Sequence, residues 1–165
     1  MMTLGIDPGT ARLGFGVIDE TPTGEPRAVA FGVVSTESVT DMPTRLMAIF
    51  EALGELLATH KPDVLAVEQL FFARNVTTAI SVGQARGIVL LAAAQAGVPV
   101  VEYSPSEVKH AVAGYGKAGK AQMQEMVRMI LGLSVIPEPD DAADALAVAL
   151  CHAQTAPFLE RTGTA

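Results

Sequence analysis

The sequence predicts a single α/β domain with a central mixed five-stranded sheet flanked by helices. Two observations support this fold class. Short apolar runs separated by turn residues fill the first third of the chain, and helical and strand patterns then alternate. The 165 residues are enough for one domain with a substantial core. We expect the domain to span residues 1–155, with residues 156–165 as a short, flexible tail.

The first three expected strands form an antiparallel meander. Residues 3–7 are apolar and stop at Pro8-Gly9, and a second strand covers residues 14–18. A turn-rich segment, residues 21–26, then leads to a third strand at residues 28–35. The meander predicts the antiparallel half of the sheet.

Helices and buried strands alternate through the rest of the chain. The Ser104-Pro105-Ser106-Glu107 segment is typical of a helix start, because serine caps the helix and glutamate completes the capping box. The remaining pattern predicts a helix from Pro43 to about residue 60, a strand at 64–67, a helix at 75–96, a strand at 99–103, and helices at 120–131 and 140–154.

Composition excludes several classes of protein. Half of the residues are hydrophobic and 18% are charged, which excludes an intrinsically disordered chain. Polar and turn residues interrupt the longest apolar run, residues 88–101, which stays short of the roughly 20 residues that cross a bilayer. No secretory signal is visible, and the single cysteine, Cys151, forms no internal disulfide. We therefore expect a cytoplasmic protein with no membrane partner.

Four carboxylates stand at positions that suggest a shared site. Asp7 and Glu68 each end a strand that should be buried, although a turn or a solvated strand end would also explain them. Asp141 and Asp144 share one face of the last helix, and Asp144 lies in an almost wholly apolar stretch. Asp140 is interpreted as a helix-start residue, because the helix dipole favours acids there.

Acids of this kind, without a cysteine–histidine cluster, indicate hard divalent cations such as Mg²⁺ or Mn²⁺. Two such ions can support phosphodiester cleavage. His152 is left out of the site, because it lies about 16 Å beyond Asp141 along the helix at 1.5 Å per residue. The pattern does not choose between Mg²⁺ and Mn²⁺.

A locally basic stretch accompanies the acids. The chain carries a net charge of −7, yet residues 69–124 hold five basic side chains against two acidic ones. Such a stretch is compatible with a phosphate-binding face. Lys109, Lys117 and Lys120 flank a glycine-rich loop, and Arg74 and Asn75 follow two phenylalanines that could stack on unpaired bases. Arg86 is assigned to packing or a subunit contact rather than to the site.

Four motifs together resemble the RuvC family of bacterial Holliday junction resolvases, which belongs to the RNase H-like superfamily. They occur in the order Gly5-Ile6-Asp7-Pro8-Gly9-Thr10, Val67-Glu68-Gln69-Leu70-Phe71, Gly83-Gln84-Ala85-Arg86-Gly87 and Asp141-Ala142-Ala143-Asp144-Ala145-Leu146-Ala147. The first motif is weak alone, because related ATPase folds share it. The similarity runs from Leu4 to about His152.

The resemblance implies an RNase H-like nuclease domain that acts as a homodimer. Such an enzyme nicks two opposing strands of a four-way DNA junction symmetrically, with the branch-migration complex RuvA–RuvB as partner, in recombination and repair. It also implies the roles of individual residues. Asp7, Glu68, Asp141 and Asp144 match the catalytic, metal-binding acids, Lys109 and Lys120 match lysines near the scissile phosphate, and Phe71 matches an aromatic that stacks on bases.

Two other functions compete with this reading. An ATP-binding protein of the actin and sugar-kinase type shares the Asp-x-Gly-Thr loop, but such proteins usually need two such subdomains, and this chain has room for one. A catalytically silent relative would only bind structured nucleic acid. Intact acids at all four positions argue against it, because a binding module would gain by losing their mutual repulsion.

Overall fold

The structure is a computed structural model and describes residues 1–21, 23–69 and 76–162. The elements follow in the order β1 (Met2–Asp7), β2 (Arg12–Glu20), β3 (Pro26–Ser35), α1 (Met42–His60), β4 (Val64–Glu68), α2 (Val76–Ala96), β5 (Val100–Tyr103), α3 (Pro105–Ala113), α4 (Lys120–Ile130) and α5 (Asp140–Thr162). The strands form one sheet in the order β3-β2-β1-β4-β5. The β3-β2-β1 part is antiparallel, whereas β1, β4 and β5 are parallel, which confirms the predicted mixed sheet.

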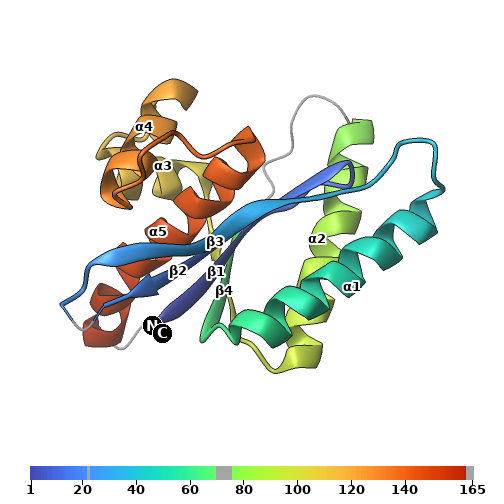
Figure 1. Cartoon of the computed structure of the whole chain (residues 1–165), viewed down its shortest axis with the longest axis horizontal. Helices are drawn as coiled ribbons and strands as arrows, with labels where there is room; N and C mark the ends of the chain where they lie inside the picture. Colours follow the sequence, from blue (N-terminus) through green and yellow to red (C-terminus); the bar gives the residue numbers. More distant parts are fainter. Residues whose placement is uncertain (22, 70–75, 163–165) are drawn as a thin grey trace.

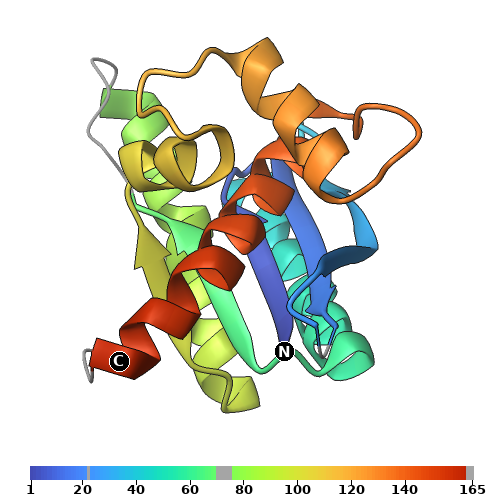
Figure 2. The same cartoon turned by 90° about the vertical axis from the view of Figure 1, so that its left-hand side faces the viewer.

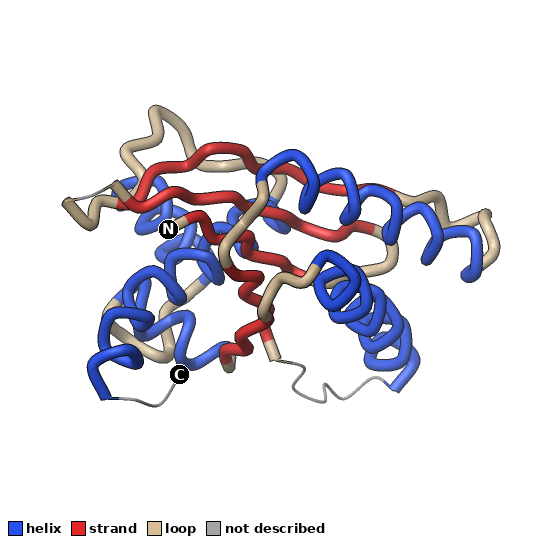
Figure 3. The backbone as a smooth tube through the Cα atoms, turned by 90° about the horizontal axis from the view of Figure 1, so that it is seen from below, coloured by secondary structure: helices blue, strands red, loops and turns tan. Residues whose placement is uncertain are grey.

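Helices cover both faces of the sheet. Figure 1 shows α1 and α2 on one face and α5 on the other, and Figure 3 shows the strands between these two groups of helices. One core cluster joins the sheet to α1 and α2 through side chains such as Ile6, Leu53 and Val89. The second joins it to α3, α4 and α5 through side chains such as Val127 and Leu146.

Local signals fix the starts of two helices. The Asp41 side chain accepts a hydrogen bond from the Thr44 backbone at 3.0 Å and caps α1. At α3, Ser104 and Glu107 form the capping box that the sequence predicts, with both reciprocal hydrogen bonds present. Because α3 follows β5 directly, this cap places the helix at the carboxyl end of the parallel strands.

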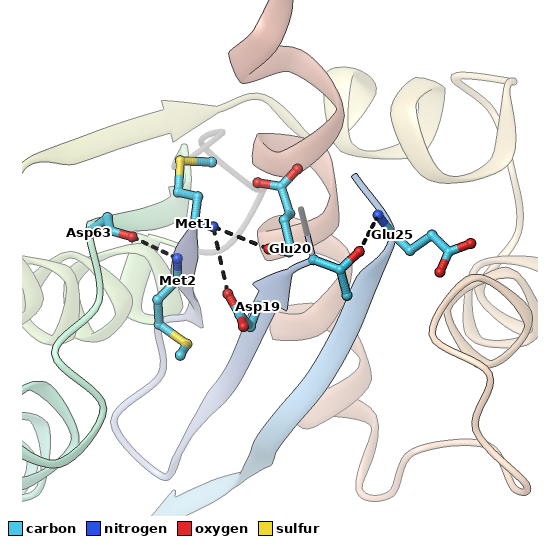
Figure 4. Close-up of polar contacts among 7 residues, drawn as sticks. Met1, Met2, Asp19, Glu20, Glu25 and Asp63 are labelled. Carbon is cyan, nitrogen blue, oxygen red and sulfur yellow. Dashed lines mark hydrogen bonds and ion pairs between the residues drawn. The ribbon is translucent and has the colours of Figure 1, made fainter. Parts of the chain in front are cut away.

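Polar contacts tie the beginning of β1 to its two neighbours (Figure 4). The Met2 amide donates to Asp63 Oδ2 at 2.7 Å, just before β4 begins. The Met1 amino group lies 3.6 Å from Asp19 Oδ1 and donates to the Glu20 carbonyl at the end of β2. These contacts secure the start of β1, and the register of β1 with β2 and β4 determines where Asp7 emerges at the other end of the strand.

The last helix is longer than the sequence analysis predicts. We expected it to end at Gln154, before a flexible tail, whereas α5 continues to Thr162. Thr155 Oγ1, one residue past the expected end, donates to Tyr103 Oη at 2.9 Å, so α5 still contacts β5 where we expected the helix to stop. Figure 2 shows α5 running along the sheet, with α3 and α4 gathered near its N-terminal half.

One described helix, α2, is apolar around most of its circumference. By length and composition alone, Ala79–Ala96 would be able to cross a membrane, with a mean hydropathy of 1.3. It buries Ala85, Val89 and Ala93 in the core and carries Arg86, which pairs with Glu102 of β5. Only 22% of the stretch is buried within the chain, so a broad apolar surface remains exposed.

Candidate active site

Asp7 and Glu68 lie side by side because their strands are parallel and in register. Ile6 pairs with Val67, and the next residue of each strand is the acid. Side chains alternate along a strand, so Asp7 shares the face of Gly5 and Glu68 shares the face of Ala66. Both faces pack against α5. The two carboxylates therefore point to the same side of the sheet at its carboxyl edge.

Glycines let α5 lie directly on the sheet next to these acids. Gly5 pairs with Gly16 across β1 and β2, and Gly14 pairs with Asp7. A Cβ atom at Gly5 or Gly14 would overlap a backbone oxygen of α5, and one at Gly16 would overlap the Leu146 side chain. This close approach brings the first two turns of α5, with Asp141 and Asp144, to the edge where Asp7 ends its strand.

A cavity of about 270 Å³ opens where these elements meet. Asp7, Glu68 and Asp144 line it, together with Lys109 of α3 and Lys120 at the start of α4. Apolar side chains, among them Val108 and Met123, complete its wall. Three of the four predicted acids and two of the predicted lysines thus share one cavity.

The crowding of negative charge changes how the acids titrate. Burial, followed by the charges of Asp144, Glu68 and Asp141, raises the pKa of Asp7 to about 7, and Lys120 partly opposes this rise. Burial and the Asp144 charge also raise the pKa of Glu68, while Lys109 opposes. Burial raises the pKa of Asp144 as well. Like charges forced together in this way require a cation to be stable as carboxylates.

Lys120 supplies part of that positive charge. Its Nζ lies 2.8 Å from Asp140 Oδ2 and 3.8 Å from Asp144 Oδ2. Asp140 is exposed and also accepts a hydrogen bond from Gln124 at 2.8 Å, so it contacts α4 from outside the cavity lining. Lys117 is exposed on the loop before α4 and also lies outside the lining.

Asp141 is the predicted acid that does not line the cavity. Its Oδ2 lies 3.1 Å from Nε of Arg12, the first residue of β2. Within the described part of the chain, no three acidic, histidine or cysteine side chains are close enough together to hold a metal ion. The donor set nevertheless fits a hard divalent cation, because it consists of carboxylate oxygens whose repulsion only a positive charge relieves.

Some residues singled out in the sequence lie away from the cavity or outside the part of the chain that the structure describes. Phe71, Arg74 and Asn75 lie outside the described residues. His152 is buried in α5, with Nδ1 2.8 Å from Tyr103 Oη, and is eight residues beyond Asp144. Its placement agrees with leaving it out of the site.

Arg12 and the glycines under α5 were not predicted as part of the site. The signal for the glycines was present, since Gly14 and Gly16 alternate on one strand and face Asp7 and Gly5 on the next. Arg12 offered no signal, because its partner Asp141 is far away in the sequence and only the fold brings them together.

Comparison with known proteins agrees with the resemblance drawn from the four motifs. A family model described as crossover junction endodeoxyribonuclease RuvC matches residues 3–152. The RuvC protein of Chloroflexus aggregans is 56% identical over 163 residues, 99% of each chain. That of Thermomicrobium roseum is 59% identical over 155 residues, 93% of each chain.

Solved structures agree at the level of the fold. A structure titled as Thermus thermophilus RuvC in complex with a Holliday junction substrate has a TM-score of 0.88 and 40% identity, and 96% of each chain is covered. The yeast mitochondrial Holliday junction resolvase Ydc2 has a TM-score of 0.69 at 13% identity, with 98% of this chain and 83% of that chain covered. The second likeness concerns the fold alone.

Proposed function

Because the chain belongs to the RuvC family of crossover junction endodeoxyribonucleases, we propose that it resolves four-way DNA junctions by symmetric nicks in two opposing strands. The Thermus relative, with its junction substrate, supports the choice of DNA. The observation that carries the proposal is the convergence of carboxylates from β1, β4 and α5 beside Lys109 and Lys120. In this proposal the enzyme serves recombination and repair in the cytoplasm.

Asp7, Glu68, Asp141 and Asp144 are the residues that would hold two divalent ions, Mg²⁺ or Mn²⁺. Bound ions supply an activated water and neutralise the charge that develops on the phosphodiester. The pKa of Asp7 is about 7 without a cation, and the positive charge of bound ions would lower it, so Asp7 would be ionised in the loaded site. The mutual repulsion of these carboxylates is therefore unfavourable in the metal-free protein and is relieved when the cations bind.

The lysines would orient the scissile phosphate. Lys109 of α3 and Lys120 of α4 both line the cavity, and their ammonium groups can donate to phosphate oxygens. Lys117 lies three residues before Lys120 and would extend this surface along the DNA backbone. Phe71, Arg74 and Asn75 follow Glu68 closely in the chain, and we propose that they contact unstacked bases at the crossover.

A homodimer would cover the apolar surface of α2. Ile80 and Leu91 are 60% and 56% exposed on this helix, which is a large apolar exposure for an isolated chain. A two-fold interface along α2 would bury both residues and present two equivalent sites to a two-fold symmetric junction. The RuvA–RuvB branch-migration complex remains the proposed partner in the cell.

The test compares a synthetic mobile four-way junction with a linear duplex of the same sequence. Each is incubated with Mg²⁺, with Mn²⁺ or with EDTA, and the nicks are mapped on all strands. We expect paired nicks on opposing strands of the junction, dependent on the metal and absent from the duplex. Equal cutting of the duplex, or no cutting of a bound junction, would contradict the proposal.

A further inference from the structure

We propose that Arg12 is a positioning residue, which holds the Asp141 carboxylate outside the cavity in the free protein and competes with a divalent cation for it. The inference deepens the proposed function and rests on it. Arg12 acts through Asp141 and is not itself placed among the cavity-lining residues.

The fold brings the two residues together at one edge of the sheet. Arg12 begins β2, two residues before Gly14, whose missing side chain leaves room for the Asp141 backbone. Arg12 Nε lies 3.1 Å from Asp141 Oδ2. That oxygen is buried and has no hydrogen bond of good geometry within the described residues. The guanidinium charge is therefore what compensates the burial of this oxygen.

Arg12 engages Asp141 outside the cavity lining, although Asp141 remains close enough for its charge to act on Asp7. Asp7, Glu68 and Asp144 line the cavity, whereas Asp141 does not, and the described residues contain no three acids placed to hold an ion. Asp141 is the fourth acid of the proposed set and is engaged by Arg12 instead. A cation that recruits Asp141 must displace Arg12, so the two positive charges compete for one carboxylate.

Arg12 is suited to be displaced. Its side chain is 58% exposed, against 23% for Asp141, so the guanidinium can move into solvent while the carboxylate stays in place. Exposed ion pairs are weak and screened by salt, and the competition is therefore modest. Lys120 does not hold an acid outside the cavity as Arg12 does, because Asp144, which it approaches, already lines the cavity.

The test is calorimetric titration of the full-length protein with Mn²⁺, without DNA, for wild type and Arg12→Gln. We expect Arg12→Gln to bind Mn²⁺ roughly two- to fivefold more tightly, the range that an exposed ion pair is worth. Arg12→Lys keeps the positive charge and should therefore bind Mn²⁺ with an affinity close to that of wild type, without the gain expected for Arg12→Gln. Arg27→Gln is the matched control, because it removes one exposed arginine at the other end of the β2–β3 pair and should leave the affinity unchanged.

Unchanged binding by Arg12→Gln would overturn the inference, because the contact would then not compete with the cation. Weaker binding would overturn it in the opposite sense, since Arg12 would then orient Asp141 as a ligand. Asp7→Asn separates the two proposals: it should lose most Mn²⁺ binding whatever Arg12 does. Mn²⁺ binding equal in wild type and Asp7→Asn would contradict the carboxylate site itself and the inference with it.

Discussion

Gly14 lies directly opposite Asp7 in the antiparallel pairing of β1 and β2, and the space left by its missing side chain is filled by the backbone of Asp141. Gly14 thus contacts both Asp7 of β1 and Asp141 of α5. Because Gly14 has no side chain, α5 can approach the sheet closely, and this approach sets the distance between the first turn of α5 and the edge at which Asp7 ends its strand.

Gly14→Ala is expected to push α5 away from the sheet, because the new Cβ would overlap the Asp141 carbonyl oxygen. Overpacking of this kind costs about 1–3 kcal/mol or more, and the variant should melt at a lower temperature and bind Mn²⁺ more weakly. Gly54→Ala is the control, because nothing lies near its Cβ position in helix α1. It should leave Mn²⁺ binding unchanged and raise stability by roughly 0.5–1 kcal/mol. Equal melting temperatures for the two variants would contradict this account of the packing.

The metal-free protein is expected to lose stability as the pH rises from about 4 to about 7. Asp7 has a pKa of about 7 in the folded state against a reference value of 3.8, so between these values the folded state binds more protons than the unfolded chain. The free energy of unfolding therefore falls with rising pH, by up to about 4 kcal/mol at roughly 1.4 kcal/mol per pKa unit.

Thermal melting in EDTA at pH 5 and pH 8 measures this effect. Asp7→Asn cannot ionise, so it should show a flatter pH dependence and exceed wild type in stability at pH 8. Glu51→Gln removes one exposed carboxylate of α1 and should keep the wild-type slope. If Asp7→Asn followed the wild-type slope as well, Asp7 would not be the group that titrates.

Asp140 and Asp141 are neighbours with different expected roles. Asp140 is exposed and pairs with Lys120 and Gln124, so Asp140→Asn should change stability little, because exposed ion pairs are weak, and should leave junction nicking within a few-fold of wild type. Asp141→Asn should abolish nicking, because it removes a proposed metal ligand. Parallel nicking assays and chemical denaturation check both statements. If Asp141→Asn nicked the junction as well as Asp140→Asn does, Asp141 would not be a ligand of the proposed site.

The proposed dimer face on α2 is tested by Leu91→Glu. A charge at this exposed apolar position would oppose burial, so the variant should sediment as a monomer and lose paired nicking. Val39→Glu is the control, because Val39 is 89% exposed on the segment before α1. It should sediment and cleave like wild type. A Leu91→Glu protein that sediments like wild type would place the interface elsewhere.

Much of the site could be predicted because its signals are local in the sequence. Asp7 and Glu68 end short apolar strands, and parallel pairing of those strands is enough to bring them together. Asp141 and Asp144 are three residues apart on one helix. The capping box of Ser104 and Glu107 predicts the start of α3. In each case a few neighbouring residues carry the information.

The rest depends on contacts between distant parts of the chain. The Arg12–Asp141 pair joins β2 to α5, and the Lys120–Asp140 pair joins α4 to α5, which no local pattern reveals. The end of α5 was predicted too early, and the contact of the Thr155 hydroxyl with Tyr103 of β5, just past the expected end, is likewise one between distant parts of the chain. The pKa of Asp7 likewise depends on acids that only the fold assembles.

The central claim is that the assembled carboxylates perform the cleavage, and Asp7→Asn tests it most directly. Nicking and binding of a four-way junction are measured in parallel, with binding followed in EDTA and nicking in Mg²⁺ or Mn²⁺. We predict no detectable nicking with junction binding close to wild type, in a protein at least as stable as wild type at pH 8. Nicking by Asp7→Asn at a rate near that of wild type would contradict the claim.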